Sequence, residues 1–506
     1  MWSEQQNTIF EAGVNGKSLL VEAGPGSGKS TTLVEQAKRL PGKVLVIVFN
    51  NTTANELQSK MPDNVTVSTM HSLGNSICKS NPGKKFEFNK WLHDKKFGKR
   101  DKKINQVFFY ALKDQGMSQR EANNYLAYLS DVCDKIRLHL VDYKDEQAVI
   151  NILDHYNLPV DRLDLIQECM LRMDNALLNK SWVDFTDMVT APIRFNMDIS
   201  GAEVKNIPYY LFDHILIDEA QDTSNAVIEI IKKLFTGKQI IAAGDVRQSI
   251  NQFAGAATDS MQQLQKAFNM TILPLTITYR CPKVHVDYIN DIFGTNLICG
   301  NTRTGFIERI AIDDIVDYVE LGDAIISRIQ NGKDAKLIPV MQQLIREGKP
   351  CRLLGFDLVG TAKSHFNSKF KGQTLTFNHY YDTEQMLIDT REYMVEKKWS
   401  PDVIDKVISD IEMVSNLLLF FLESNTNKQW EDFTNWLYNL ETEKNSCITL
   451  SSTHKFKGAE AHNIFILDSD KLPMYRDGQK EWQKISEDNV YYVALSRSLE
   501  GLYLCN

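Results

Sequence analysis

The chain has 506 residues, of which 43% are hydrophobic and 24% charged, and its formal net charge is −8. This size and composition predict several domains with substantial cores, and the negative charge argues against a protein that simply coats nucleic acid. No stretch approaches the roughly 18 to 20 apolar residues of a membrane helix, and residues 1–6 lack a secretory pattern, so we expect no membrane partner. Eight scattered cysteines without a CxxC pair predict buried thiols in a reducing compartment.

Apolar strands alternate with helical segments along the chain, which is typical of parallel α/β layers. A first series covers residues 19–23, 44–49, 65–69, 215–218, 240–243 and 272–278, and a second covers 324–327, 351–354, 448–451, 464–467 and 502–504. We therefore predict an α/β fold of two domains with parallel sheets, each carrying a mainly helical insertion. The expected bounds are 1–85 and 183–282 for the first domain, 86–182 for its insertion, 283–360 and 447–506 for the second domain, and 361–446 for a small second insertion.

A glycine-rich segment at residues 23–30 follows the first predicted strand and precedes a helical pattern. In such a loop backbone N–H groups cradle phosphates, Lys29 reaches the terminal phosphates and the Ser30 hydroxyl holds Mg²⁺. Ala23 stands where the commonest pattern has its first glycine, but the ordered glycines, lysine and serine outweigh the alternative of a simple glycine-rich turn. The candidate ATP-binding residues here are Gly24, Gly26, Ser27, Gly28, Lys29, Ser30 and Thr31.

Paired acids end a second apolar strand about two hundred residues later. Asp218 is expected to hold Mg²⁺ together with Ser30, and Glu219 to polarise the attacking water. Gln248, after the next strand, is placed to sense the γ-phosphate, because ligands of α/β sheets bind at the strand carboxyl ends. The two segments together predict ATP hydrolysis with ATP and Mg²⁺ as cofactors.

A basic segment between Lys84 and Lys103 carries nine lysine and arginine residues against three acids, with aromatic residues interleaved. Basic side chains meet phosphates and aromatic rings stack on bases, so the segment is a candidate nucleic-acid contact. A solvated helix with its aromatic side chains in the core fits the same pattern. The sequence leaves both interpretations open.

The ordered motifs along the whole chain resemble those of the UvrD/Rep/PcrA family of superfamily 1 DNA helicases. The segments that carry the resemblance are 2–10, 23–31, 49–57, 68–73, 184–188, 218–222, 244–256, 275–280, 452–460 and 492–497. One departure lies in Asn251-Gln252-Phe253-Ala254-Gly255-Ala256, which has one aromatic residue and no arginine where the family usually has two aromatics and an arginine. The resemblance implies that both domains are RecA-like P-loop motor domains.

The resemblance also implies roles for residues outside the phosphate loop. Arg280 and Arg497 would be arginine fingers that stabilise phosphoryl-transfer charge. Around the nucleotide, Gln6 would read the adenine edge, Tyr279 would stack on adenine and Glu460 would contact the ribose, with Gly458 beside it. The catalytic set is thus Lys29, Glu219, Gln248, Arg280 and Arg497.

For the nucleic acid, the resemblance implies a strand contacted by both domains. The candidate contacts are Phe49, Asn50, Thr69, His71, Phe253, Ser452 and His454. The implied activity is ATP-dependent translocation on single-stranded DNA and duplex unwinding, 3′ to 5′, in replication, repair or recombination. Partners would be single-stranded DNA, single/double-strand junctions and a nuclease or replication or repair factor, in a bacterial cytoplasm or, for a virus-encoded chain, the host cytoplasm.

Two other classes of protein compete with a free-standing helicase. One is a DNA-stimulated ATPase subunit of a larger nuclease or defence complex, in which a partner cuts the DNA. The other is an ATP-gated DNA-binding module without hydrolysis, against which the intact set of catalytic candidates argues. ATP turnover without strand separation by the pure chain would favour the ATPase subunit. DNA-stimulated ATP turnover would argue against the non-hydrolysing module.

Overall fold

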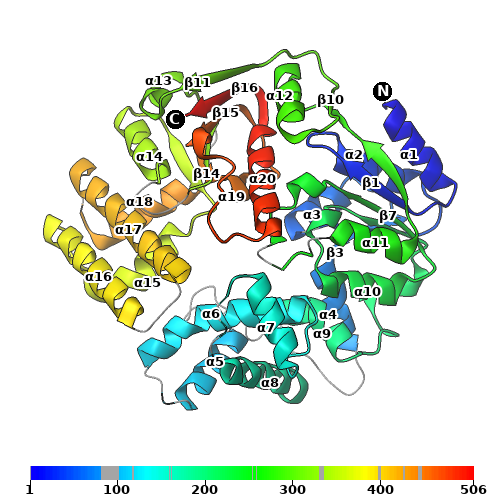
Figure 1. The fold of residues 1–506 in the computed structure, drawn as a ribbon, viewed down its shortest axis with the longest axis horizontal. Coiled ribbons are helices and arrows are strands. Elements are labelled where there is room, and N and C mark those ends of the chain that lie inside the picture. The colour runs from blue at the N-terminus through cyan, green and yellow to red at the C-terminus, as the bar shows by residue number, and fades with distance from the viewer. Residues whose placement is uncertain are drawn as a thin grey trace. The chain divides into compact units, whose positions relative to one another are not determined.

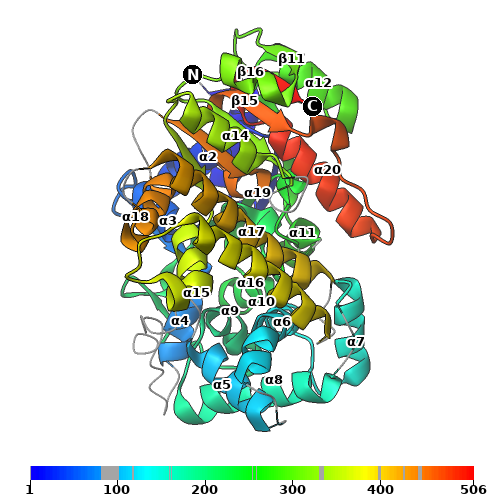
Figure 2. The same cartoon turned by 90° about the vertical axis from the view of Figure 1, so that its left-hand side faces the viewer.

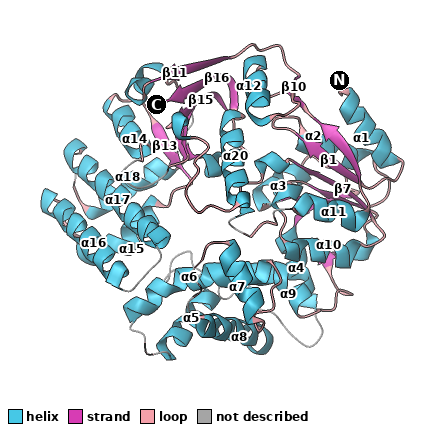
Figure 3. Cartoon of the chain, viewed as in Figure 1, coloured by secondary structure: helices cyan, strands magenta, loops and turns pink. Residues whose placement is uncertain are grey.

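In the computed structural model the chain forms two compact units. Unit 1 consists of Met1–Ile277 with Lys480–Trp482, and unit 2 of Thr278–Gln479 with Gln483–Asn506. The described residues are 2–506 without 49, 81–101, 115, 117, 118, 159, 161, 253, 254, 258, 330–334, 397–400, 426, 427 and 443–446. In each unit strands gather into a sheet with helices around it (Figure 3). No described helix is long and apolar enough to cross a bilayer.

Among the described residues, unit 1 contains a six-stranded parallel sheet in the order β3-β2-β6-β7-β1-β8, of which Figure 1 labels β1, β3 and β7. Its four inner strands are nearly continuous apolar runs, because helices bury both faces of a parallel sheet. The strands are β1 (Leu19–Ala23), β2 (Val44–Val48), β3 (Val65–Thr69), β6 (His214–Ile217), β7 (Gln239–Gly244) and β8 (Thr271–Leu275), with a small hairpin of β4 (Glu203–Val204) and β5 (Ile207–Pro208) elsewhere in the unit.

Two hydrophobic clusters cover the two faces of this sheet. On one face the strands pack with α1 (Glu4–Val14), α2 (Lys29–Arg39) and α3 (Asn51–Gln58). On the other they pack with α4 (Met70–Ser80), α9 (Phe185–Arg194), α10 (Asn225–Phe235) and α11 (Ser260–Phe268). The alternation of side chains along each strand sends successive residues to opposite clusters, as with Leu19 and Leu20.

A helical insertion interrupts unit 1 between α4 and α9. It contains α5 (Lys102–Asp114), α6 (Gln119–Leu138), α7 (Glu146–His155) and α8 (Leu163–Lys180). These helices share a core of their own, and α5, α6 and α8 lie side by side in both views (Figure 2). The basic segment 84–103 lies almost wholly outside the described residues.

Unit 2 has its own six-stranded parallel sheet among the described residues, in the order β11-β16-β15-β12-β14-β13. Its strands are β11 (Phe306–Ile310), β12 (Ala324–Ser327), β13 (Cys351–Leu354), β14 (Ile448–Ser452), β15 (Ala461–Leu467) and β16 (Ser498–Cys505). The short strands β9 (Ile277–Thr278) and β10 (Ile298–Cys299) pair with each other.

Helices again cover both faces of the unit 2 sheet. One cluster joins the strands to α12 (Lys283–Phe293), α19 (Thr453–Phe456) and α20 (Glu481–Leu495). The other joins them to α13 (Ile315–Tyr318), α14 (Leu337–Arg346), α15 (Leu358–Phe370), α17 (Pro401–Ser424) and α18 (Trp430–Glu441). The helix α16 (Phe377–Glu396) packs along α17.

Several strands differ from the sequence expectation, among them the short strands β4, β5 and β10, which were not predicted. The stretch 272–278, predicted as one strand, is divided into β8 and β9, which belong to different sheets. The strand β11 was not predicted, because it is an edge strand with the polar, exposed residues Glu308 and Arg309, and it lacks the apolar run of an inner strand.

Candidate functional site

The sheet of unit 1 brings the sequence-distant motifs to one edge. Parallel strands β6, β7 and β1 are neighbours, so their carboxyl ends meet. The glycine loop follows β1, Asp218 and Glu219 follow β6, and Gln248 follows β7. Such an edge is where α/β sheets bind ligands.

The loop before α2 has the backbone of an anion cradle. Gly26 and Gly28 have φ values of +65° and +77°, a left-handed conformation that glycine adopts without steric cost, and Gly28 caps α2. The Gly24 N–H donates to the Leu275 carbonyl at 2.9 Å, which ties the loop to β8. The buried Ser27 hydroxyl has no hydrogen-bond partner among the described residues. A helix N-terminus with spare donors fits a phosphate.

Lys29 and Ser30 contact the paired acids directly. The Lys29 Nζ lies 2.7 Å from Glu219 Oε1 and 3.8 Å from Asp218 Oδ1, and the Ser30 hydroxyl donates to Asp218 Oδ2 at 2.6 Å. Burial would lower the pKa of Lys29, but Glu219 and Asp218 outweigh it and raise that pKa. Burial raises the pKa of Asp218 despite Lys29. The lysine therefore stays charged in a buried site that holds two carboxyl groups.

A second layer of polar contacts orients Glu219 and Gln248. Glu219 has a φ of +53°, a strained value for a residue with a side chain, and strain of this kind concentrates at functional sites. Gln221 Nε2 donates to Glu219 Oε2 at 2.5 Å, and Gln221 Oε1 accepts from the Asp245 N–H at 3.1 Å. Gln248 Nε2 donates to Asp245 Oδ2 at 2.7 Å. Burial raises the pKa of Asp245 to about 6.

The Gln6 side chain lies beside the loop, and its amide group forms hydrogen bonds with Ser3 and Thr32. Its Oε1 accepts from the Ser3 N–H at 3.0 Å in a capping box, and its Nε2 donates to the Thr32 hydroxyl at 3.0 Å. A Cβ on Gly28 would lie 3.7 Å from Gln6 Nε2, so this amide is next to the cradle. Thr31 is exposed at the start of α2. Adenine recognition by Gln6 stays a prediction.

Unit 2 gathers three of its candidate residues around Ser496. Arg280 Nε lies 2.6 Å from Glu460 Oε2, and its Nη1 is 3.5 Å from the Ser496 carbonyl. Arg497 donates through Nε to the Val493 carbonyl at 3.0 Å and through Nη2 to the Ser496 hydroxyl at 2.9 Å. Two arginines and an acid that are far apart in sequence thus form one polar cluster.

Two further unit 2 candidates flank this cluster in the chain. Tyr279 is exposed, and the backbone carbonyls of Tyr279 and Arg280 each accept from Arg303 Nη2 at 2.8 Å. Gly458, at a φ of +89°, turns the chain between α19 and β15, just before Glu460. Arg303 therefore holds the backbone that carries the candidate adenine and phosphate contacts.

The candidate nucleic-acid contacts of unit 1 begin helices. Asn50 caps α3 by accepting from the Thr53 N–H at 2.8 Å, and Thr69 accepts from the Ser72 N–H at 3.2 Å at the start of α4. The His71 ring stacks on the exposed Phe185 ring, with 3.8 Å between centroids and 19° between planes. Burial lowers the pKa of His71 to about 4, so its ring is neutral at pH 7. The candidates Phe49 and Phe253 lie outside the described residues.

The corresponding candidates of unit 2 lie at α19. Ser452 is fully buried, and its hydroxyl caps α19 by accepting from the Lys455 N–H at 3.2 Å. Burial, with the cations Arg328, Lys457 and Lys455, lowers the pKa of His454 to about 4. Their contact with a strand stays a prediction.

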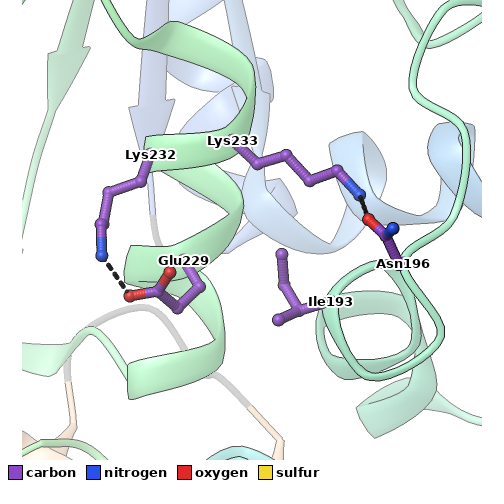
Figure 4. Close-up of a pocket in the computed structure, with 5 residues that line it drawn as sticks. All are labelled: Ile193, Asn196, Glu229, Lys232 and Lys233. Carbon is purple, nitrogen blue, oxygen red and sulfur yellow. Dashed lines mark hydrogen bonds and ion pairs between the residues drawn. The ribbon is translucent and has the colours of Figure 1, made fainter.

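A separate surface hollow of about 440 Å³ is lined by residues of α9, α10 and the turn after α9, none of which belongs to the motifs (Figure 4). Its lining cations are already engaged: Lys232 pairs with Glu229 at 2.6 Å, and Lys233 donates to Asn196 Oδ1 at 2.8 Å. The hollow therefore offers no free charge pattern for a nucleotide, and the strand-end site is the better candidate by its chemistry.

Sequence reasoning missed Gln221, Asp245 and Arg303. Gln221 and Asp245 stand inside the segments 218–222 and 244–256, so the signal was present but gave them no role. Gly244 leaves room for the Gln221 side chain, since a Cβ at position 244 would lie 2.7 Å from Gln221 Oε1. Arg303 lies outside every motif, and only its contacts identify it.

The donor set at the strand ends fits Mg²⁺. Ser30 and Asp218 bring a hydroxyl and a carboxylate oxygen together, and Mg²⁺ prefers one or two such protein ligands completed by phosphate oxygens and water. The Lys29 ammonium beside them fits the terminal phosphates of a nucleotide. The site therefore suits a nucleoside triphosphate with its metal.

Comparison with known proteins matches residues 2–269 to the UvrD/REP helicase N-terminal domain. The chain is 24% identical to the ATP-dependent DNA helicase Rep of Buchnera aphidicola subsp. Schizaphis graminum, over 56% of this chain and 43% of the relative. It is 25% identical to a probable DNA helicase II homolog of Mycoplasma genitalium, over 53% and 38%. It is 23% identical to the ATP-dependent DNA helicase PcrA of Bacillus subtilis, over 55% and 38%.

The matched parts span less than half the length of these three relatives. The family match covers more than half of this chain and includes the phosphate loop, the paired acids and Gln248. The expected fold of two RecA-like α/β domains with parallel sheets is confirmed. The chain belongs to the UvrD/REP helicase family.

Proposed function

We propose that the chain is an ATP-dependent translocase on single-stranded DNA and a DNA helicase that moves 3′ to 5′, in replication, repair or recombination. The observation that carries the proposal is the meeting of Lys29 and Ser30 with Asp218 and Glu219 at the strand ends of unit 1. Relatives named ATP-dependent DNA helicases support it.

In the proposed reaction Lys29 exchanges its carboxylate contacts for the terminal phosphates of ATP. Glu219, released from Lys29 and still oriented by Gln221, accepts a proton from the attacking water. Ser30 and Asp218 would hold Mg²⁺, which would neutralise phosphate charge when bound. Gln248, held by Asp245, senses the γ-phosphate.

In unit 2, Arg280 and Arg497 would stabilise the charge that develops during phosphoryl transfer. The Glu460 contact orients Arg280, and Glu460 would exchange it for the ribose. The two units would then change their mutual arrangement with nucleotide state, and a strand gripped by each in turn would move. The proposed grip uses His71, Thr69 and Asn50 in unit 1 and His454 and Ser452 in unit 2, with Phe49 and Phe253.

The test compares Lys29→Ala with Glu219→Gln in an assay of ATP turnover with and without oligo-dT. Both variants should lose DNA-stimulated turnover, and in Glu219→Gln the rate should fall by at least about a hundredfold, because the general base is removed. Glu219→Gln should still bind ATP, because the loop and Lys29 remain, whereas Lys29→Ala should not. Single-strand binding should persist in both.

Unwinding of 3′-tailed, 5′-tailed and forked duplexes by the pure chain tests the rest of the proposal. Strand separation only with a 3′ tail is the expected result. ATP turnover without strand separation would point instead to an ATPase subunit that acts with a nuclease. Unchanged turnover in Lys29→Ala would refute the assigned phosphate site.

A further inference from the structure

A fully buried arginine connects the helical insertion to the helix that carries Phe185. Arg137, near the end of α6, has no exposed side-chain surface. Its Nη1 lies 2.7 Å from Asp184 Oδ2 and 2.9 Å from Asp187 Oδ1, and its Nη2 lies 2.5 Å from Asp134 Oδ1. One guanidinium thus donates hydrogen bonds to three carboxyl groups.

Asp184 and Asp187 already define where α9 begins. The Asp187 N–H donates to Asp184 Oδ1 at 2.7 Å and the Asp184 N–H donates to Asp187 Oδ2 at 3.0 Å, which is a reciprocal capping box. Each carboxylate therefore uses one oxygen for the cap and the other for Arg137. Nη1 donates to both cap carboxylates, while Nη2 donates to Asp134 of α6, so the planar guanidinium fork fixes the direction in which Nη1 points.

The start of α9 is in turn tied to α4, the helix that carries His71. Phe185, the first residue of α9, stacks on the His71 ring. Gly74 of α4 lies so close to α9 that a Cβ there would be 1.9 Å from the Met188 carbonyl oxygen. Because backbone meets backbone at this point, the first turns of α4 and α9 are packed too closely to move independently.

We propose that Arg137 is a positioning residue for the DNA-contacting edge of unit 1. It sets the place of the α9 N-terminus, and with it the Phe185 and His71 rings, from the helical insertion. This inference rests on the proposed function, since it assigns to the insertion the task of presenting His71 to a strand.

The charges around Arg137 support a specific role beyond simple packing. Burial would lower the pKa of Arg137, but Asp184, Asp134 and Asp187 outweigh it and keep the group charged. Burial raises the pKa of Asp134, although Arg137 opposes the rise. A buried guanidinium held by several carboxyl groups tolerates little displacement, because any shift leaves a buried charge unpaired.

The experiment compares Arg137→Lys with Arg194→Lys in the full chain. Arg194 is a matched control: it also joins α9 to the insertion, through Asp174 of α8 at 2.9 and 3.0 Å, but at the opposite end of α9. Arg137→Lys keeps the positive charge but replaces the two terminal nitrogens of the guanidinium with a single ammonium. We expect its half-saturating concentration of oligo-dT to rise about tenfold, with ATP turnover at saturating oligo-dT within about twofold of the original. Arg194→Lys should leave both values unchanged.

Hydrogen exchange without DNA supplies an independent measurement. In Arg137→Lys, amides at the start of α9 and α4 should exchange faster, while in Arg194→Lys any change should stay at the end of α9. If Arg137→Lys does not fold, Asp134→Asn, which removes one carboxylate at the partly exposed side of the cluster, should give the same pattern more weakly.

Equal effects of the two arginine variants on oligo-dT dependence would overturn the proposal, as would faster exchange without any change in that dependence. Failure of the proposed function gives a different result. In that case the original chain shows no DNA-stimulated turnover, while the exchange pattern still reports whether Arg137 positions α9.

Discussion

His71 and His454 are neutral at physiological pH, so neither would add charge to the proposed DNA-binding surface. Burial lowers the pKa of both rings to about 4. The stack of His71 on Phe185 leaves flat, uncharged rings at the start of α4, which suits contact with bases more than with phosphates. The His71 and Phe185 rings are therefore better suited to stack on bases than to pair with phosphates.

The lowered pKa of His71 predicts a loss of stability in acid. The His71 ring takes up a proton near pH 6.5 in the unfolded chain and only near pH 4 in the folded chain. Its contribution to the free energy of unfolding is therefore fully present above pH 6.5 and is lost as the pH drops toward 4. At pH 5 this one group should lower the free energy of unfolding by about 2 kcal/mol relative to pH 7.5. Urea unfolding at both pH values should show that His71→Asn removes this part of the loss. An equal pH dependence in the variant would contradict the burial of the ring.

Among the elements, the pair α4 and α9 depends on Gly74. A glycine inside a helix costs about 1 kcal/mol relative to alanine, so its presence needs a packing reason. That reason is the Met188 carbonyl, which occupies the place of a Cβ. The close approach lets α9 lie directly on the helix that carries His71.

Gly74→Ala should therefore destabilise the chain by about 1 to 3 kcal/mol, in spite of the higher helix propensity of alanine. Gly13→Ala in α1 is the control, because the three atoms nearest to its Cβ would belong to the end of the Gln36 side chain and not to a backbone. Thermal unfolding of both variants measures the difference. A Gly74→Ala variant as stable as the original would show that the helices can separate without cost.

For the whole molecule, the question is whether unit 2 takes part in catalysis. Its candidate residues Arg280, Glu460 and Arg497 form one cluster around Ser496, which individual motifs do not reveal. The cluster supports a joint role, because contacts within unit 2 hold both guanidinium groups.

Arg497→Ala should lower the rate of ATP turnover by about a thousandfold or more, as expected for an arginine finger, with little change in ATP affinity. The exposed Arg309 of β11 offers the control variant Arg309→Ala, which should behave like the original. Nucleotide binding and steady-state turnover together separate affinity from rate. Loss of affinity with an unchanged rate would assign Arg497 to binding alone.

The amino-acid sequence alone determined most strands of the two sheets and the segments that carry the family resemblance. Strands 19–23, 65–69, 324–327 and 351–354 agree with the structure to the residue, because short segments rich in apolar and β-branched residues stand out locally. The glycine loop and the paired acids were likewise recognisable, since their chemistry needs neighbouring residues in a fixed order.

Only the tertiary structure decided which distant groups meet. Strand order brings Lys29 to Glu219, and close packing chooses Gln221, Asp245 and Arg303 as the groups that orient the motifs. Arg137 is an ordinary charged residue in a helical pattern until the fold places it among three carboxyl groups. Local sequence carries backbone preference and burial pattern, whereas the partners of a polar side chain depend on three-dimensional packing between elements that are remote in the chain.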